Sequence, residues 1–283
     1  MRAIVGNRMS RHFSASLLLE RPWDLNIDAI ASALRTLFPA IGDVDSVHGQ
    51  ADDTDAGVLI IEGATVVVQS FAEPLPVGDM TPALRPLRAG GADEAASAHQ
   101  AHVTISAGGA LPGLEGAEAY AALVHFVAAA TLSITPSTAV FWKNGWALSR
   151  AETFSASANM LLQGKMPVGT WVSYAVIVPT GMQPAQATGM VSYGLRPFIG
   201  RELELAPRPC EARAAFQTLN TISRKILDTG AMLSDGIVVR SEDGGISFVV
   251  RERNYWLRRD SSAFVLIADD AVIDSETLNV SNG

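Results

Sequence analysis

Segments with strand-like and helix-like hydrophobic patterns follow one another in a mixed order, and this order limits what the chain can fold into. Short apolar runs at 13–20, 58–61 and 65–71 predict strands. Apolar residues at helical spacing over 27–41, and a nearly all-apolar stretch over 115–133, predict helices. Because strands and helices do not alternate regularly, we expect an α+β fold with mixed or antiparallel sheets and helices packed on one face, and no doubly wound parallel sheet.

The rest of the chain continues this mixture. Further strands are predicted at 102–106, 138–142, 171–178, 187–193, 201–205, 236–240, 246–251 and 262–268. Ser149 and Glu152 form a capping-box pattern that predicts the start of a short helix. A longer amphipathic helix runs from Pro209 to Gly230, and Phe216 lies in the middle of its apolar stripe, so we expect Phe216 to face the core.

The break at 164–169, which contains two glycines and a proline, is the one plausible domain boundary in the sequence. We therefore divide the chain into an N-terminal extension (1–12), an α+β lobe (13–165), a second α+β lobe (166–273) and a flexible tail (274–283). The lobes could be two similar halves, or they could form one continuous domain.

Composition restricts the class of protein. Apolar residues make up 48% of the chain and charged residues 18%, so a sizeable core is available. Cys210 is the only cysteine, which excludes an internal disulfide framework and fits a reducing compartment. No signal-peptide pattern is visible, and no apolar stretch reaches the ~20 residues that a membrane span requires. We expect a cytoplasmic protein that does not enter a membrane.

Acidic residues gather in one part of the sequence. The chain has 29 acidic and 21 basic residues, a formal net charge of −8. The stretch 41–94 holds ten of the acids and only two arginines, a balance that disfavours nucleic acid as a partner. It is either a solvated loop that aids solubility or a docking face for a basic partner. The candidate contact residues on such a face are Asp52, Asp53 and Asp55.

Two tryptophans lie close to a turn. Within the segment 141–146, Trp142 and Trp146 flank a predicted turn that contains Asn144 and Gly145. The two rings could form a platform for a binding partner, as aromatic residues often do at interfaces. They could equally roof the core beneath the neighbouring helix.

No motif of a known chemistry is present in the sequence. The chain has no phosphate-binding glycine loop, no dinucleotide fingerprint and no G-x-S-x-G elbow. His99 and His102 are the only closely spaced histidines, and a spacing of three that leads into a strand suits packing or capping better than metal binding. We expect no metal and no cofactor. If the protein is an enzyme, His102 and His125 are the alternative catalytic residues.

Several short motifs in a shared order suggest a family. They lie at 17–22, 72–76, 99–105, 139–142, 188–195 and 233–236. Taken together, over about 13–250, they resemble the DUF4261 family, a bacterial group without an assigned activity. One departure is the segment 196–200, which reads RPFIG where the family pattern has an acidic residue after proline. The resemblance implies a bacterial cytoplasmic origin and a shared fold, and it implies no reaction.

These observations favour a non-enzymatic cytoplasmic binding protein. One concrete form would be an immunity or accessory protein of a bacterial toxin or secretion system, whose acidic face blocks a basic protein. We expect neither nucleic acid nor membrane as a partner, and the oligomeric state stays open. The alternative is an enzyme of unrecognised motif with a histidine-containing cleft between the lobes.

Overall fold

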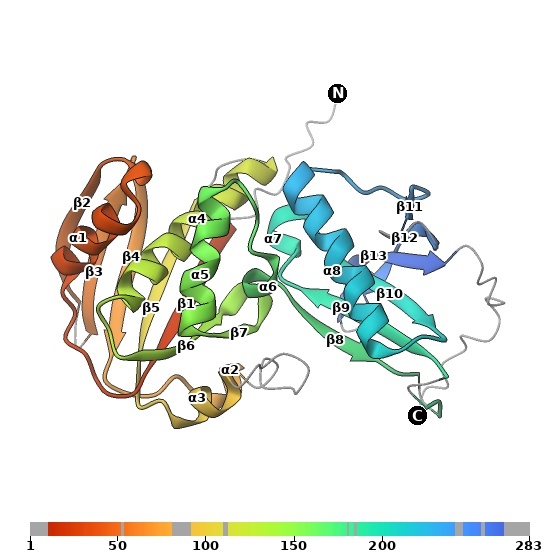
Figure 1. Cartoon of the computed structure of the whole chain (residues 1–283), viewed down its shortest axis with the longest axis horizontal. Coiled ribbons are helices and arrows are strands. Elements are labelled where there is room, and N and C mark those ends of the chain that lie inside the picture. The colour runs from red at the N-terminus through yellow and green to blue at the C-terminus, as the bar shows by residue number, and fades with distance from the viewer. Residues whose placement is uncertain are drawn as a thin grey trace. The chain divides into compact units, whose positions relative to one another are not determined.

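A computed structural model of the protein describes residues 11–51, 54–80, 92–109, 113–179, 181–183, 186–240, 246–255 and 258–268. The chain divides into two compact units, Met1–Ser173 and Tyr174–Gly283 (Figure 1). This division lies later than the boundary expected between 165 and 166. The difference arises because the short helix α6 (Val168–Trp171) contacts β7 (Ala147–Arg150) of the first unit.

The first unit is built on a seven-stranded sheet with the strand order β2-β3-β4-β5-β1-β6-β7, and every neighbouring pair is antiparallel. The remaining strands are β1 (Arg11–Leu19), β2 (Val44–Ala51), β3 (Thr54–Ile61), β4 (Ala64–Phe71), β5 (Ala101–Gly109) and β6 (Ser137–Trp142). The first strand of the chain thus lies inside the sheet, between β5 and β6. Polar residues from distant parts of the sequence are brought side by side by this insertion.

The helices of the first unit are α1 (Ile27–Leu37), η1 (Pro39–Ile41), α2 (Val77–Met80), α3 (Ala92–Ala98), α4 (Gly113–Leu132), η2 (Lys143–Gly145) and α5 (Ala151–Leu162), besides α6. Asn26 caps the start of α1, because its Oδ1 accepts a hydrogen bond from the Ala29 backbone N–H at 2.9 Å. Helix α4 contacts α1, α5 and the strands β1 and β5, as its nearly all-apolar sequence predicted (Figure 1).

The main core of the first unit lies between the sheet and the helices α1, α4 and α5, and a smaller buried cluster lies between α3 and the opposite face at β6 and β7. Helix α1 approaches β3 so closely that position 57 has to be glycine. A Cβ atom there would lie 2.9 Å from Cβ of Ile27, a separation that real side chains do not adopt. The expected helix start at Ser149 is wrong, because Ser149 pairs with Val140 in the β6–β7 ladder and α5 begins two residues later.

The second unit has a six-stranded sheet with the order β11-β12-β13-β10-β9-β8. Its strands are β8 (Ser173–Ile177), β9 (Thr188–Tyr193), β10 (Glu202–Arg208), β11 (Val238–Arg240), β12 (Ser247–Tyr255) and β13 (Arg258–Ala268), and its helices are α7 (Arg196–Ile199) and α8 (Ala212–Thr229). Strands β10 and β13 are parallel, whereas β9–β10, β11–β12 and β12–β13 are antiparallel. The expected α+β class with mixed and antiparallel sheets is therefore confirmed.

Helix α8 packs on β9 and β10 and ends at Gly230, as the sequence predicted, and Gly230 has a left-handed φ of 65°. One expectation about its faces is wrong. Phe216 is 43% exposed, and its ring contacts Tyr174 edge-on with ring centroids 5.4 Å apart. The buried stripe consists of Ala215, Leu219, Ile222, Ser223, Ile226 and Leu227. Among the helices described, none is both long enough and apolar enough to cross a membrane.

Candidate functional site on the open face of the first sheet

The two faces of the seven-stranded sheet differ in chemistry. On β1, Phe13, Ala15 and Leu17 point toward α4, whereas Ser14 and Ser16 point the other way, since side chains alternate along a strand. We call the side that carries Ser14 and Ser16 the open face. Strand β4 shows the same asymmetry, because its residues alternate between buried and half-exposed.

One row of paired residues crosses five strands on the open face. Its members, from the β2 edge inward, are Val47, Val58, Val67, Ser106 and Ser14, each opposite the next in register. The open face therefore changes from apolar at the β2 edge to polar at the centre of the sheet. These two zones are the candidate sites of the molecule.

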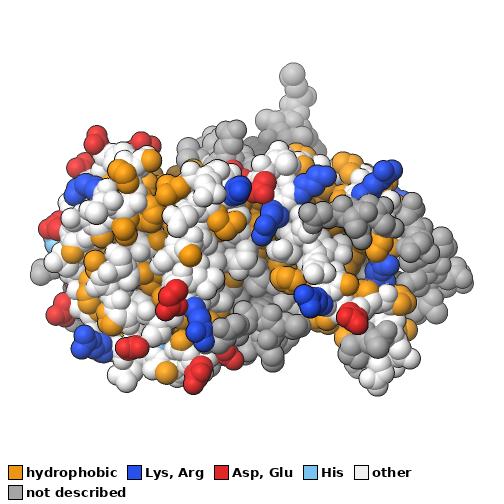
Figure 2. All heavy atoms as spheres, in the orientation of Figure 1, with side chains coloured by type: hydrophobic (Ala, Val, Ile, Leu, Met, Phe, Trp, Pro, Cys, Tyr) orange, Lys and Arg blue, Asp and Glu red, His pale blue; other side chains and the backbone are white. Residues whose placement is uncertain are grey.

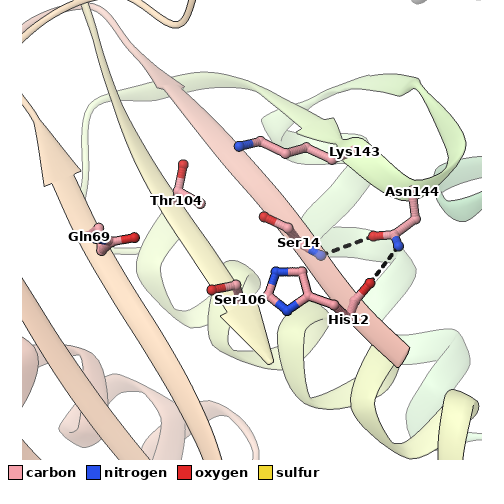
Figure 3. Close-up of a pocket in the computed structure, with 7 residues that line it drawn as sticks. All are labelled: His12, Ser14, Gln69, Thr104, Ser106, Lys143 and Asn144. Carbon is pink, nitrogen blue, oxygen red and sulfur yellow. Dashed lines mark hydrogen bonds between the residues drawn. The ribbon is translucent and has the colours of Figure 1, made fainter. Parts of the chain in front are cut away.

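The polar zone contains a pocket of about 360 Å³ (Figure 3). Its lining residues are His12 and Ser14 from β1, Gln69 from β4, Thr104 and Ser106 from β5, and Lys143 and Asn144 from η2. Figure 3 shows the Lys143 side chain extending over β1, with its amino group on the side where Thr104 lies. A cavity of this size suits a small molecule, since ligand pockets usually measure about 300–1,000 Å³.

Asn144 holds one wall of this pocket in place. Its Oδ1 accepts a hydrogen bond from the Ser14 backbone N–H at 3.0 Å, and its Nδ2 donates to the His12 carbonyl at 2.7 Å. The pairing of β1 with β6 begins only at Ala15 and Trp142, so the Asn144 amide replaces a strand along the unpaired part of β1. This clamp fixes the neighbouring Lys143 over the open face.

Polar groups in the pocket are available to a ligand. Among the described residues, no protein atom forms a hydrogen bond or ion pair with the side chains of His12, Gln69, Ser106 or Lys143. Thr104 Oγ1 lies 3.0 Å from Ser16 Oγ, which is buried at the floor of the same face. Burial lowers the pKa of Lys143, an effect that the charge of Asp79 partly opposes. None of the lining residues that the structure describes is acidic.

The two closely spaced histidines support the chain at the edge of this zone. His99 Nε2 accepts a hydrogen bond from the Leu75 N–H at 2.8 Å, and His99 Nδ1 donates to the Ala96 carbonyl. His102 Nδ1 lies 2.9 Å from the Glu73 carbonyl, and its ring stacks on Phe71 with centroids 4.5 Å apart. Burial lowers the pKa of His102, with a contribution from the Lys143 charge. Within the described residues, no three histidine, cysteine or acidic side chains are placed to hold a metal ion.

His125 lies wholly inside the core of the first unit. Its Nδ1 accepts a hydrogen bond from Trp171 Nε1 at 3.0 Å, so the proton of the neutral ring is on Nε2, which lies 3.2 Å from the Phe154 carbonyl and 3.1 Å from Ser157 Oγ. Burial lowers the pKa of His125 to about 3. Ser157 Oγ itself donates to the Phe154 carbonyl at 2.7 Å, so His125 does not accept its proton as a general base would. The geometry does not support the catalytic role considered for His125.

Trp142 does not offer a surface to a partner. It is fully buried and stacks on Trp171 with ring centroids 5.6 Å apart, which corrects its placement among the partner-contacting residues. Trp146 is partly buried against a small core cluster that includes Leu18 and Phe141, so it covers one side of this cluster. It adopts a left-handed conformation with φ of 45°, which is unusual for a residue with a side chain.

The acidic segment contains a strand that sequence reasoning did not predict. Residues 44–51 form β2, the edge strand of the sheet. Asp55 is exposed, but its Oδ2 accepts a hydrogen bond from the Leu25 N–H at 2.8 Å and so ties the start of α1 to β3. Asp52 and Asp53 lie outside the described residues. The exposed acids of β2 and its flanks that the structure does place are Asp43, Asp45 and Glu62.

Strand β10 of the second unit carries the buried Glu204 and, two residues before it, the half-buried Glu202. The Glu202 carboxylate accepts hydrogen bonds from Ser192 Oγ at 2.7 Å and from the backbone N–H groups of Gly194, Leu195 and Arg196 at 2.9, 3.1 and 3.2 Å. Burial raises the pKa of Glu202, and these four donors oppose the rise. The arrangement holds the turn that leads into α7, which gives Glu202 a structural role.

Sequence reasoning missed the polar pocket. The signal that could have revealed it is the alternation of Ser14 with Ser16 and of Thr104 with Ser106 in otherwise apolar strands. Comparison with protein-family models, with curated proteins and with solved structures finds no match to the chain. The resemblance to the DUF4261 family therefore stays a prediction from sequence motifs.

Proposed function

We propose that the protein is a non-enzymatic binding protein that docks a basic protein on the β2–β3 surface, which we define as Asp45, Val47, Val58 and Ile60. The single observation that carries the proposal is the exposure of neighbouring apolar residues on the open face of an edge hairpin. Val47 is 50% exposed and Ile60 is 37% exposed. Val47 lies opposite Val58, and Asp45 lies opposite Ile60, so the four side chains form one patch.

The charge around this patch supports a basic partner. Residues 41–80 contain eight acids and no lysine or arginine. The described basic side chains at this hairpin lie on the α1 side of β2, where the Arg35 guanidinium donates to the Val44 carbonyl and His48 bonds to Asp28. Figure 2 shows the helix-covered face of the first unit, where both acidic and basic side chains lie along the outer margin. An apolar patch surrounded by acidic residues favours a partner whose contact surface has an apolar centre surrounded by basic residues.

The wider proposal follows from this chemistry. A bacterial cytoplasmic immunity or accessory protein would bind a toxin or secretion component in this way, by covering its basic surface. Strand β2 adds a second means of recognition, because it is paired on one side only and an edge strand can accept a strand from a partner. Neither mode requires a catalytic residue.

Site-specific photocrosslinking in the native host tests the proposal. A photoreactive amino acid replaces Val47, and the matched control places it at Met232, which is 76% exposed and belongs to the second unit. We expect one basic protein to crosslink at position 47 and not at 232, and the purified pair to dissociate when Ile60 is changed to lysine. The same crosslinked set at both positions, or none at position 47, would count against docking on this surface.

A further inference from the structure

We propose that the polar pocket between β4, β5, β1 and η2 binds a small molecule through a carboxylate or phosphate group, with Lys143 as its counter-charge. This site is separate from the β2–β3 surface and does not depend on protein docking there. The argument rests on the shape of the pocket, its unused donors and the sign of its charge.

The pocket has fixed walls. Thr104 and Ser106 lie opposite Ser16 and Ser14 in the β5–β1 ladder, and Gln69 lies opposite Thr104 in the β4–β5 ladder. The hydrogen bonds of a central sheet hold these backbones, so the floor needs little reorganisation when a ligand binds. The wall formed by η2 is held by the Asn144 clamp on β1.

The lining offers more donors than the protein uses. Ser106 has a hydroxyl, Gln69 has an amide and His12 has a ring N–H, and within the described chain none of these side chains has a protein partner. Figure 3 shows the side chains of Gln69, Thr104, Ser106 and His12 gathered around the space beneath Lys143. A ligand rich in acceptor oxygens would satisfy several of them together.

The charge of the pocket selects an anion. Among the described residues that line the pocket, Lys143 is the one lysine or arginine, and none is an aspartate or a glutamate. Its ammonium group is partly desolvated, and the described residues provide no ion pair for it. A ligand oxyanion placed beside Lys143 would restore the lost solvation of the ammonium, which makes binding of an anion more favourable than binding of a neutral or cationic analogue. Carboxylate and phosphate share this chemistry.

Titration with small anions tests the assignment. The full-length protein is titrated with inorganic phosphate, acetate, and three-carbon hydroxy acids with and without a phosphate group, and binding is followed by calorimetry and by NMR. We expect at least one probe to bind and to shift the Lys143 side-chain resonance. If the phosphorylated probes bind and the simple acids do not, the ligand is a phosphate ester; the reverse result identifies a carboxylate. The absence of binding by every probe at about 10 mM would overturn the proposal.

Variants separate the pocket from general electrostatic attraction. Lys143→Met should weaken the binding of the best probe by about ten- to hundredfold, because a hydrogen bond to a charged group is lost. Lys143→Arg should keep part of the affinity. The matched control is Lys165→Met, which removes an exposed lysine outside the pocket and should leave the affinity unchanged. Equal loss in the two methionine variants would contradict a specific site. If Lys143→Met fails to fold, Ser106→Ala provides a milder test with an expected loss of about threefold or more.

Discussion

The side-chain carbonyl of Asn144 accepts a hydrogen bond from the backbone N–H of Ser14 at 3.0 Å, although 130 residues separate them in the chain. The same amide donates to the His12 carbonyl, so one side chain satisfies two backbone groups of β1 on the side where β6 does not pair with them. Both the polar pocket and the β2–β3 surface lie on the open face of the sheet that contains β1. The two Asn144 hydrogen bonds therefore connect the fold of the first unit directly to the wall of its polar pocket.

Replacing this clamp should weaken the first unit. We expect Asn144→Ala to lower the free energy of unfolding by about 1–3 kcal/mol, because two hydrogen bonds are lost and two backbone groups lose their partners. Asn144→Asp keeps the acceptor for Ser14 but has no donor for His12, so its effect should be smaller at neutral pH. Denaturant unfolding of the three proteins measures the difference. A loss below ~0.5 kcal/mol for the alanine variant would show that water replaces the clamp.

The buried histidine should make stability depend on pH. The pKa of His125 is lowered by burial to about 3, from an ordinary value of 6.5. Between these two values the unfolded chain binds a proton on this ring and the folded chain does not, so stability falls as the pH decreases through this window, by up to about 1.4 kcal/mol per pH unit.

The His125→Gln variant isolates this contribution. Glutamine does not titrate, so the decline of stability between pH 6.5 and pH 4 should be less steep in the variant than in the wild-type protein. Unfolding free energies at four or five pH values in this range provide the comparison. Parallel curves would mean that the ring is protonated in the folded protein, which would contradict its place in the core.

Glu202 should be essential to the second unit. Four donors bond to its carboxylate, three of them backbone N–H groups in the turn before α7. Glu202→Ala should destabilise the protein by about 3–5 kcal/mol, because it leaves these donors unpaired in a buried site. The matched control, Glu211→Ala, changes an exposed residue and should alter stability by less than ~1 kcal/mol. Thermal unfolding of both variants tests the contrast.

Helix α8 allows a direct test of side-chain orientation. Leu219 is fully buried, so Leu219→Ala should cost about 2–5 kcal/mol. Phe216 is 43% exposed, so Phe216→Ala should cost only about 1–2 kcal/mol, most of it from lost contact with Tyr174. The denaturant concentrations at the unfolding midpoints of the two variants give the two losses of stability. An equal or larger loss at position 216 would place Phe216 in the core after all.

Local sequence signals predicted the elements that local interactions stabilise. The strands that contain 58–61 and 65–71, and the end of α8 at Gly230, follow from residues within a few positions. The capping-box pattern at Ser149 failed, because pairing of Ser149 with Val140 in a neighbouring strand outweighs the local preference for a helix start.

The sites were less predictable than the elements. The polar pocket is formed when β1 inserts between β5 and β6, and no local pattern specifies this pairing. The segment of the β2–β3 surface was recognised as acidic, but β2 was not predicted, because Val44 and Val47 are its only large apolar residues and their spacing of three does not give the alternation of a strand. Trp142 was considered for a binding platform because the sequence does not show that Trp171 stacks against it.

The docking proposal is tested most directly by the rate at which the partner identified by crosslinking associates with the protein. This rate is measured for the wild-type protein and for the double variant Asp43→Asn/Asp45→Asn, at low and at physiological salt. We expect the double variant to associate about threefold or more slowly at low salt and to show a weaker salt dependence, with unchanged stability, because exposed acids steer a basic partner. Equal rates and equal salt dependence in the two proteins would contradict the proposal that the β2–β3 surface docks a basic protein.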